Sequence, residues 1–243
     1  GTIQRLVQQI ILDRRRHGED TGDFLSMLLL ARDENTGEQM SDRQVRDQVL
    51  TLLLAGHETT AKALSWTFYL LSQHAAVQQR LEAEVDEVLQ GLPPTVADLS
   101  RLPYTWMVIE ESLRLYPPIW IMSRRCAADD EIDGFHIPAQ SLVTISPYAM
   151  HRHPQFWGDP ERFEPEHFRP ERSAERQPFT YFPFGGGPRL CLGKHFASVE
   201  THLVLATLAQ RYRLHLKPQH SVEPEALVTL RPHLGLPMTL QAR

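Results

Sequence analysis

The sequence predicts a mainly α-helical fold with small β-sheets, an α-rich member of the α+β class. Three observations support this prediction. Apolar residues recur at helical spacing over long stretches, while segments that alternate like strands are short and bounded by turn residues. Among 243 residues, 42% are hydrophobic and 23% are charged, which is typical of a globular protein that buries a sizeable core.

Six segments carry the signals of helices. The longest, 41–73, begins at a Ser41 cap with acidic Asp42 in its first turn, where a carboxylate is favoured. The first, 2–17, ends in a run of cations before Gly18, and both features favour a helix C-terminus. The six expected helices are 2–17, 23–33, 41–73, 76–90, 104–116 and 192–211.

Shorter segments alternate between apolar and polar residues and are expected to form strands. Asp133-Gly134 provides a hairpin turn within the segment 131–137. The stretch 153–184 is rich in proline and charge and is long for a structureless connection, which favours a packed, functional loop. The expected strand segments are 119–126, 131–137, 142–145, 227–230 and 237–241, the last two as a pair.

Charge and cysteine content limit the class of protein. A formal net charge of -5 argues against nucleic-acid binding. No stretch of about twenty apolar residues and no signal peptide is visible. The chain as given is therefore expected to be soluble and cytoplasmic, while a membrane anchor in a longer chain stays open. There are 2 cysteines, and use of one as a metal ligand leaves no disulfide, which suits a reducing compartment.

Cys191 is the candidate metal ligand, because the run 184–193, Phe-Gly-Gly-Gly-Pro-Arg-Leu-Cys-Leu-Gly, suits a metal-bound thiolate. Glycine and proline favour a tight turn whose amides can point at the sulfur. Such donors matter, since a buried anionic sulfur is costly unless hydrogen bonds or a metal offset its charge. Phe184 is placed to shield the sulfur, and Arg189 suits an acidic group of the same ligand. The alternative is a buried free cysteine beside a flexible loop.

A second motif lies in the expected helix 104–116, which Pro117-Pro118 brings to an end. Glu111 and Arg114 are three residues apart and share a face, so they can pair. Apolar neighbours on several sides predict that the helix is buried, where an unpaired charge is expensive. The alternative is an exposed helical ion pair of little energetic weight.

The third motif, Ala-Gly-His-Glu-Thr-Thr at 55–60, interrupts the apolar face of the longest helix. Gly56 is unfavourable in a helix by roughly 1 kcal/mol relative to alanine, which indicates a close approach to the backbone there. Glu58 and Thr59 offer a carboxyl group and a hydroxyl beside that gap. A solvated polar patch is the alternative. A zinc-protease His-Glu-x-x-His helix is excluded, because Ala61 stands where the second histidine would be.

The spacing Phe-x-x-Gly-x-Arg-x-Cys-x-Gly resembles the haem-binding signature of the cytochrome P-450 superfamily. It is formed by Phe184, Gly187, Arg189, Cys191 and Gly193. The order of the motifs is also similar to that family: acid-threonine helix, Glu-x-x-Arg helix, hairpin, arginine loop, cysteine loop and final helix. The resemblance spans nearly all of the chain but only about half of the family's fold. It implies that residues 1–243 are the C-terminal part of a single haem-thiolate domain, without its N-terminal half.

For the cofactor, the resemblance implies haem b with Cys191 as its axial thiolate ligand. Arg124 and Arg189 are expected to contact the haem propionates, although Arg124 can instead be a surface charge. Whether this chain alone binds haem stays open. The remaining cofactor-binding positions that the resemblance implies are Gly56, Phe184, Gly187 and Gly193.

Other roles follow from the same resemblance. Glu58 and Thr59 are expected to lie over the distal face of the haem and to relay protons to bound dioxygen. Arg162, in the proline-rich stretch, is expected to complete an ion-pair network with Glu111 and Arg114. The substrate side is expected to be lined, with ordinary core as the alternative, by Ile119, Trp120, Ile121, His233 and Leu234.

The implied function is that of a haem-thiolate monooxygenase, which inserts one oxygen atom of O2 into a small, largely apolar substrate. The sequence has neither a flavin or dinucleotide glycine fingerprint nor a cysteine cluster for iron-sulfur. A separate electron donor, a ferredoxin or a flavoprotein reductase, is therefore expected. Three alternatives stay open: a peroxide-using or isomerising haem-thiolate enzyme, a haem-binding sensor, and a truncated non-catalytic fragment.

Overall fold

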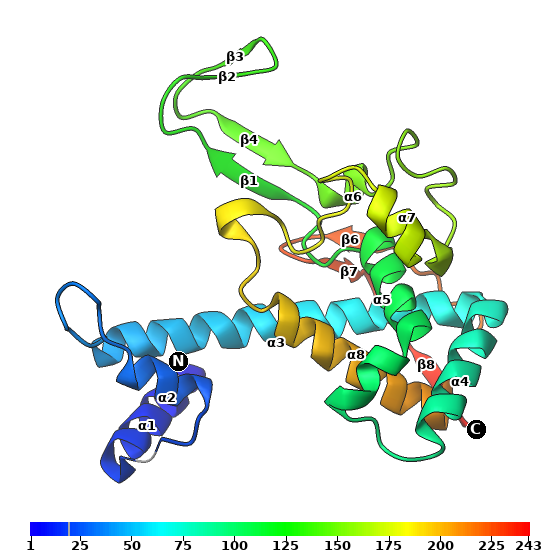
Figure 1. Cartoon of the computed structure of the whole chain (residues 1–243), viewed down its shortest axis with the longest axis horizontal. Coiled ribbons are helices and arrows are strands. Elements are labelled where there is room, and N and C mark those ends of the chain that lie inside the picture. Colours follow the sequence, from blue (N-terminus) through cyan, green and yellow to red (C-terminus); the bar gives the residue numbers. More distant parts are fainter. Residues whose placement is uncertain (19) are drawn as a thin grey trace. The chain divides into compact units, whose positions relative to one another are not determined.

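The structure, a computed structural model, describes residues 1–18 and 20–243 (Figure 1). It confirms the mainly α-helical class with small β-sheets. The chain divides into two compact units, 1–58 and 59–243. Each unit has a hydrophobic core of its own.

The first unit holds two helices and the start of a third: α1 (Thr2–His17), α2 (Phe24–Leu30) and α3 (Asp42–Gln73). α1 ends as predicted, because Gly18 takes a left-handed conformation with φ of 64° that caps the helix. At the start of α3, the Ser41 and Gln44 side chains each accept a hydrogen bond from the other's backbone N–H. The core of this unit consists of Val7, Ile11, Leu28 and Val45.

The second unit is built on the rest of α3 and three further long helices, α4 (Ala75–Leu89), α5 (Pro103–Leu115) and α8 (Lys194–Arg211). α4, α5 and α8 pack against one another. Complete burial of a leucine or isoleucine stabilises a fold by roughly 1.5–3 kcal/mol, and the inaccessible side chains include Leu81, Val108, Ile109 and Leu205. The short helices are η1 (Val96–Arg101), α6 (Pro147–Met150), η2 (Pro165–Phe168), α7 (Pro170–Glu175) and η3 (Gly187–Arg189).

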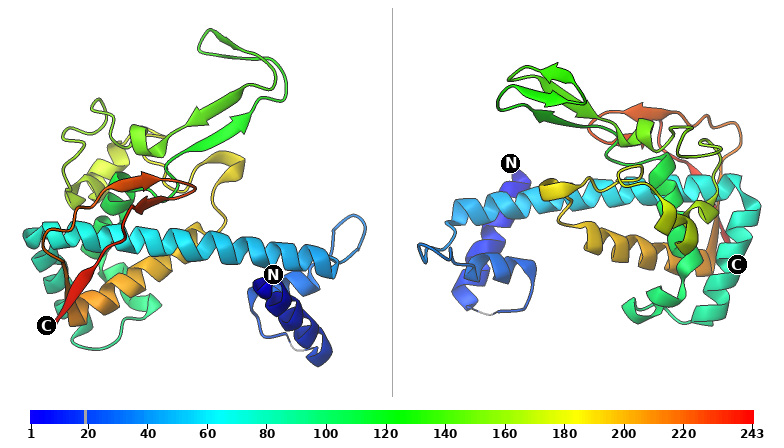
Figure 2. Two further views of the ribbon diagram at one scale, coloured as in Figure 1. Left: turned by 180° about the vertical axis from the view of Figure 1, so that it is seen from behind. Right: turned by 45° about the horizontal axis from the view of Figure 1, so that its top comes forward.

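The sheets of the described residues each consist of two antiparallel strands. The four pairs are β1 (Met122–Arg125) with β4 (Leu142–Ile145), β2 (Asp130–Ile132) with β3 (Phe135–Ile137), β5 (Tyr212–Leu216) with β8 (Met238–Ala242), and β6 (Pro224–Ala226) with β7 (Leu230–Pro232). Asp133 and Gly134, with φ of 50° and 80°, form the predicted turn. The β2–β3 hairpin extends from the end of the β1–β4 pair, away from α5 and α8 (Figure 2).

The predicted pairing of 227–230 with 237–241 is wrong. Leu230 begins β7, which pairs with β6. β8 pairs instead with β5, the strand that directly follows α8. The strand 212–216 follows the helix without a turn signal, so the local pattern did not mark it. Periodicity identifies a strand, but the partner is chosen by contacts far apart in the chain.

The stretch 153–184 is packed, as expected. It contains η2 and α7, and three of its aromatic side chains, Trp157, Phe163 and Phe168, are buried in the main core. Proline begins both short helices, where its missing N–H is not needed. The irregular appearance of this sequence therefore reflects short elements and not a linker.

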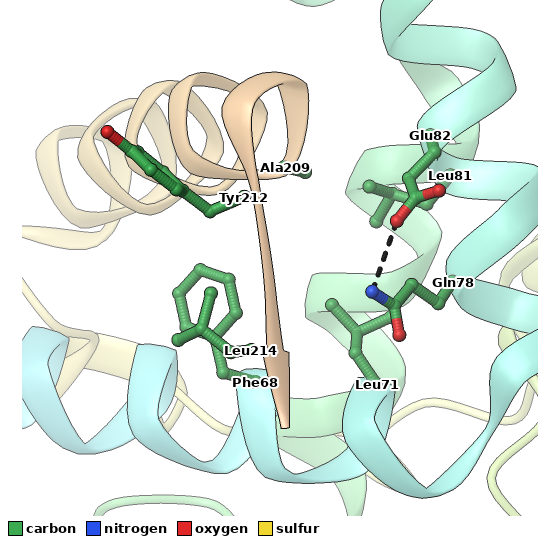
Figure 3. A pocket seen from close by; sticks show the side chains of 8 residues that line it. All are labelled: Phe68, Leu71, Gln78, Leu81, Glu82, Ala209, Tyr212 and Leu214. Atoms are coloured by element: carbon green, nitrogen blue, oxygen red, sulfur yellow. Dashed lines mark hydrogen bonds between the residues drawn. The ribbon is translucent and has the colours of Figure 1, made fainter. Parts of the chain in front are cut away.

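A small cavity lies between α3, α4, α8 and β5 (Figure 3). Its volume is about 10 Å³, which is at the lower limit for one water molecule. Gln78 donates a hydrogen bond of 3.1 Å to Glu82 in its wall. This cavity is a packing defect and not a ligand site.

Burial keeps two histidines of the second unit neutral. Burial lowers the pKa of His151 to about 3, and the His151 ring accepts a hydrogen bond of 2.9 Å at Nε2 from the Phe182 N–H. Burial also lowers the pKa of His202 to about 4, and its Nε2 lies 3.1 Å from the Leu102 carbonyl oxygen. An unfolded histidine takes up a proton below a pH of about 6.5. In the folded chain the two buried rings stay unprotonated. Both residues therefore make the protein less stable as the pH falls from about 6.5 toward 4.

Glu110 on α5 acts in the opposite direction. Burial raises the pKa of its carboxyl group to about 7, partly offset by the charges of Arg176 and Lys194. The folded state then holds a proton that the unfolded carboxyl group has released, so the stability from Glu110 is present below about pH 4.5 and is lost as the pH rises through 7. Between about pH 4.5 and 6.5, the effect of the two histidines is larger than that of the glutamate. The combined contribution of these three groups to stability therefore falls with acidification.

We predict that His202→Gln weakens this acid sensitivity, because glutamine keeps an N–H donor for Leu102 but does not titrate. The free energy of unfolding, measured with urea between about pH 6.5 and 5, should fall less steeply by roughly 1.4 kcal/mol per pH unit than in the unmodified chain. The exposed His136 provides the control, and His136→Gln should leave the slope unchanged. Equal slopes in all three proteins would contradict the burial of a neutral His202.

Candidate functional site

The cysteine loop, residues 184–193, contains η3, leads into α8 and is closed by hydrogen bonds of its own backbone. The Cys191 N–H donates to the Phe184 carbonyl oxygen at 3.0 Å, and the Gly185 N–H donates to the Phe182 carbonyl oxygen at 2.9 Å. Gly185 and Gly187 have φ of 75° and 64°, which only glycine adopts without strain. The sequence therefore forms a fixed turn that presents the cysteine.

The Cys191 thiol is free and exposed. α8 begins three residues later, and helix N-termini favour anionic ligands. Leu190, Leu192 and Phe196 flank the thiol in sequence and are exposed, with 85% of Leu192 accessible. A thiol with apolar neighbours in sequence suits a flat apolar ligand whose metal takes sulfur. This donor set fits a haem.

Two arginines lie where they can meet acidic groups of such a ligand. Arg189 is exposed in η3, inside the cysteine loop. Arg124 is exposed on β1, two residues beyond Met122, so both project from the same face of the strand. The Met122 side chain would lie 3.8 Å from a Cβ atom placed on Gly185. The strand that carries Arg124 therefore lies beside the cysteine loop.

The other loop positions are also located. Phe184 is half-buried against the main core. Gly193 precedes α8, and a Cβ atom there would lie 4.0 Å from Cys191 Sγ. Shielding of the sulfur by Phe184 stays a prediction.

The Glu111–Arg114 pair is fully buried, as the apolar helix predicts. Arg114 Nε and Nη2 donate to the two Glu111 carboxylate oxygens at 2.7 Å each. The remaining donors of the guanidinium reach the carbonyl oxygens of His151, Pro160 and Arg162 at 2.9, 2.7 and 2.9 Å. All five N–H groups of the guanidinium thus have acceptors. An exposed ion pair, the alternative considered for this motif, is ruled out.

The Arg162 side chain is not part of this network, so that prediction is wrong. The Arg162 side chain is 65% exposed, its Nε lies 3.7 Å from Glu164 Oε2, and the Arg162 group that reaches Arg114 is the backbone carbonyl. The third side chain is His167, whose Nδ1 lies 3.2 Å from Glu111 Oε1. The Glu164 N–H donates to the same oxygen at 2.8 Å. Because the backbone carbonyl of Arg162 is turned toward Arg114, the Arg162 side chain lies at the surface beside Glu164.

A repeated sequence pattern could have indicated His167 as the third member of the network. The pattern Pro-Glu-x-Phe occurs twice, at 160–163 with arginine and at 165–168 with histidine. The structure uses the second copy. Sequence reasoning also missed His151, which is buried behind the network, and Trp157, whose ring lies 4.9 Å from the Arg114 guanidinium.

Gly56, Glu58 and Thr59 lie on α3, which is continuous through this motif. Gly56 and Glu58 are exposed and Thr59 is half-buried. A Cβ atom on Gly56 would meet no heavy atom of the described residues within 4 Å. The close approach predicted at this glycine is therefore not made by the described part of the chain. The proton-relay role of Glu58 and Thr59 stays a prediction.

The predicted substrate residues separate into two groups. Ile119, Trp120 and Ile121 lie beside the β6–β7 hairpin, since Trp120 Nε1 donates to the Leu227 carbonyl oxygen at 2.8 Å. His233 and Leu234 follow β7, and His233 Nδ1 lies 3.2 Å from Glu225 on β6. The tip of this hairpin is the turn 227–229, and its residues Leu227 and Val228 were expected to lie in a strand.

A closed glycine loop that presents an exposed thiol, with an arginine and apolar residues adjacent in sequence, is typical of the haem-thiolate class of proteins. A family model described as cytochrome P-450 matches residues 1–236. The chain belongs to the cytochrome P-450 family. Haem with a cysteine thiolate ligand is the cofactor of this family. No helix of the described residues is both long and apolar enough to cross a membrane.

Several known proteins are similar to this chain. Cyclooctat-9-en-7-ol 5-monooxygenase of Streptomyces melanosporofaciens is 45% identical over 216 residues, which cover 89% of this chain and 47% of that relative. Pentalenene oxygenase of Streptomyces avermitilis is 40% identical over 239 residues, 98% of this chain and 53% of that relative. The structure of retinoic acid bound cyanobacterial CYP120A1 superposes with a TM-score of 0.94 at 36% identity, over 100% of this chain and 56% of that one. The chain spans about half the length of the relatives it matches.

We predict that Glu111→Ala or Arg114→Ala lowers the free energy of unfolding by roughly 3–5 kcal/mol, because either change leaves the partner charge buried and unpaired. Arg162→Ala is the matched control, since its side chain is exposed and its carbonyl is retained. It should change stability by less than about 0.5 kcal/mol. His167→Ala should lower the free energy of unfolding, measured with urea, by more than Arg162→Ala does. The reverse order would restore Arg162 to the network.

Proposed function

We propose that the chain is the C-terminal part of a single haem-thiolate domain and that the protein is a monooxygenase. It inserts one oxygen atom of O2 into a small, largely apolar substrate and takes electrons from a separate ferredoxin or flavoprotein reductase. The observation that carries the proposal is the closed loop that presents Cys191 among apolar side chains. The named relatives support the reaction type, because both are called oxygenases or monooxygenases.

In this proposal the cofactor is haem b, held by Cys191 as its thiolate ligand. When bound, the haem supplies the oxygen-activating chemistry. Arg189 and Arg124 bind its propionates with charge-assisted hydrogen bonds. Leu192 and Phe196, which are exposed in the structure, would contact the cofactor and exclude water from it. The fixed backbone of the loop keeps the sulfur in place without a cost of ordering on binding.

Glu58 and Thr59 manage protons in this proposal. The Glu58 carboxyl group and the half-buried Thr59 hydroxyl would deliver protons to the side of the cofactor where dioxygen reacts. Gly56 lies three residues before Thr59 on the same helix face. Because it has no side chain, it would leave room for dioxygen beside the helix backbone. These roles need a carboxyl group and a hydroxyl adjacent in sequence, which the motif provides.

We propose a cyclic, terpene-like hydrocarbon as the substrate. Two relatives are named for cyclooctat-9-en-7-ol and pentalenene, both largely hydrocarbon compounds. The apolar side chains at Ile119, Ile121, Leu227 and Val228 suit such a molecule, because apolar surface drives its binding. A peroxide-using enzyme and a haem-binding sensor are separated from this function by the second experiment below.

We predict that Cys191→Ala abolishes the red-shifted Soret band of the ferrous carbon monoxide complex, which reports thiolate ligation. Cys126→Ala is the matched control, because Cys126 is half-buried outside the loop and should leave the band intact. Both variants are read in the haem-loaded protein by absorbance. A thiolate spectrum in Cys191→Ala would show that the loop was misassigned.

We predict that Thr59→Ala uncouples reductant use from product formation but spares turnover supported by peroxide. Productive cleavage of dioxygen needs ordered proton delivery, whereas peroxide already carries its protons and electrons. The full protein with a surrogate reductase is assayed for NADPH consumed, hydrogen peroxide released and substrate oxidised. Unchanged coupling would remove Thr59 from the relay. An unmodified protein that turns over only with peroxide, or by neither route, would replace the proposal by a peroxide-using enzyme or by a sensor.

A further inference from the structure

Three aromatic side chains of the second unit form one cluster between α3 and the end of α5. Trp66 and Tyr69 lie on α3, and Tyr116 directly follows the last residue of α5. The rings of Trp66 and Tyr116 are stacked, with centroids 4.0 Å apart and an interplanar angle of 7°. Tyr69 meets both rings edge-on, at 5.8 Å from Trp66 and 6.3 Å from Tyr116. Aromatic side chains usually pack with centroids about 4.5–7 Å apart, so the Trp66–Tyr116 stack is closer than packing requires.

This cluster lies on the face of α3 that carries Thr59. Trp66 comes seven residues after Thr59, close to two helical turns, so the two side chains project from one face about 10.5 Å apart along the axis. The Trp66 ring is completely buried. Indole and phenol are the aromatic side chains that lose an electron most easily, and stacked rings can pass that loss from one to the next. The cluster therefore provides a path for electrons that leads toward the side where dioxygen is proposed to react.

Easily oxidised sulfur lies beside the proposed haem site. The Met122 Sδ atom would be 3.9 Å from a Cβ atom placed on Gly185, in the cysteine loop. The Cys191 thiol is itself exposed. Methionine is oxidised to a sulfoxide and cysteine to sulfinic and sulfonic acids, and the last of these changes is irreversible. A haem that has been oxidised without a substrate to react with would damage these side chains unless its oxidising equivalents leave by another route.

The surroundings of the two stacked rings favour transfer of an electron from Tyr116 to Trp66. The Trp66 indole N–H donates to the Leu230 carbonyl oxygen at 3.1 Å, and a carbonyl is too weak a base to remove that proton. An oxidised Trp66 therefore stays a cation and takes up an electron readily. The Arg152 guanidinium lies 5.5 Å from the Tyr116 ring, and its charge opposes a second cation there. An oxidised Tyr116 therefore releases its phenol proton, and the half-buried side chain gives that proton access to solvent.

We propose that Trp66 and Tyr116 form a relay that removes oxidising equivalents from the haem when no substrate is oxidised. Trp66 gives one electron to the peroxide-oxidised haem, and Tyr116 gives one electron to Trp66. The Tyr116 O–H proton passes to solvent, which leaves a neutral phenoxyl radical. Two such transfers supply the two electrons that the oxidised haem lacks, and with two protons from solvent the oxygen atom left by peroxide leaves as water.

A thiol in solution completes the cycle. It restores each phenol by giving one electron and one proton, and two oxidised thiols then join as a disulfide. Tyr69 contacts both rings of the relay and is half-buried, so it can share the phenoxyl radical with Tyr116. The inference rests on the proposed function for the haem and the position of Thr59, and it does not depend on the identity of the substrate.

Electron paramagnetic resonance tests the relay in the haem-loaded full protein, frozen directly after mixing with hydrogen peroxide without substrate. Trp66→Phe keeps a ring in the stack but removes the indole, and it should lose most of the phenoxyl radical signal. Trp106→Phe, on α5 and outside the cluster, is the matched control and should keep the signal. Equal radical yields in these two variants would overturn the relay.

A second variant guards against a folding defect in Trp66→Phe. The double variant Tyr69→Phe with Tyr116→Phe keeps all three rings and the Trp66 hydrogen bond, but it has neither phenol. It should also lose most of the phenoxyl signal, whereas Tyr212→Phe on β5 should keep it. A full signal in the double variant would show that the radical lies elsewhere and would overturn the role of Tyr116.

Protection is measured by mass spectrometry of Met122 after a fixed exposure to peroxide, with the haem-free protein as the background for direct oxidation. Trp66→Phe and the double variant should both raise the fraction of Met122 sulfoxide by roughly twofold or more, and Trp106→Phe should match the unmodified protein. Loss of the radical with unaltered oxidation of Met122 would overturn the protective role.

These measurements need neither a substrate nor a reductase, because peroxide supplies the oxidising equivalents. An unmodified protein without the red-shifted carbon monoxide band would contradict the haem assignment and the relay together. A protein that has this band but forms no phenoxyl radical would contradict the relay alone. A protein that forms the radical but oxidises no substrate would support the relay and contradict the proposed monooxygenase reaction.

Discussion

The buried Glu111–Arg114 pair is the interaction on which the rest of this fold depends. Both side chains are inaccessible to solvent, so each charge would be strongly unfavourable without a partner. The carboxylate satisfies two of the five guanidinium donors, and backbone carbonyls of the segment 151–162 satisfy the others. α5 thereby dictates the path of a stretch that has too little regular structure to fix itself. This explains how a proline-rich segment without helical or strand periodicity becomes a packed part of the core.

The same network extends to the cysteine loop through a short series of hydrogen bonds. Arg114 binds the carbonyl of His151, and the His151 ring accepts from the Phe182 N–H. The Phe182 carbonyl in turn accepts from Gly185, at the start of the turn that presents Cys191. These hydrogen bonds connect the cysteine loop to the buried ion pair on α5. The position of the thiol therefore depends on that pair more than on the surface around the loop. A neutral His151 is required for this connection, since a protonated ring could not accept at Nε2, and burial supplies that condition by lowering its pKa to about 3.

The sequence predicted the parts of the fold that local physics determines. α1 was bounded correctly because Gly18 and the preceding cations mark its end, and β4 because its alternation is clear. The partner of Glu111 could not be decided in the same way. Two Pro-Glu-x-Phe quartets offered the same backbone signal, and the choice of His167 over Arg162 depends on which one reaches α5 after the chain turns. The strand pair at the end failed for a similar reason, because pairing partners are set by contacts between distant residues.

The two sides of the candidate site differ in how firmly they are built. On the cysteine side, positive φ at two glycines, a backbone turn and a buried ion pair all specify one geometry. On the hairpin side, the tip depends on the register of a three-residue turn and on the hydrogen bond from the Trp120 indole. The cysteine motif can be recognised from sequence, because its glycines are required by the turn and its cysteine by the role of metal ligand. The tip is not readable in this way: Leu227 and Val228 look like strand, and only the pairing of Ala226 with Leu230 makes them a turn.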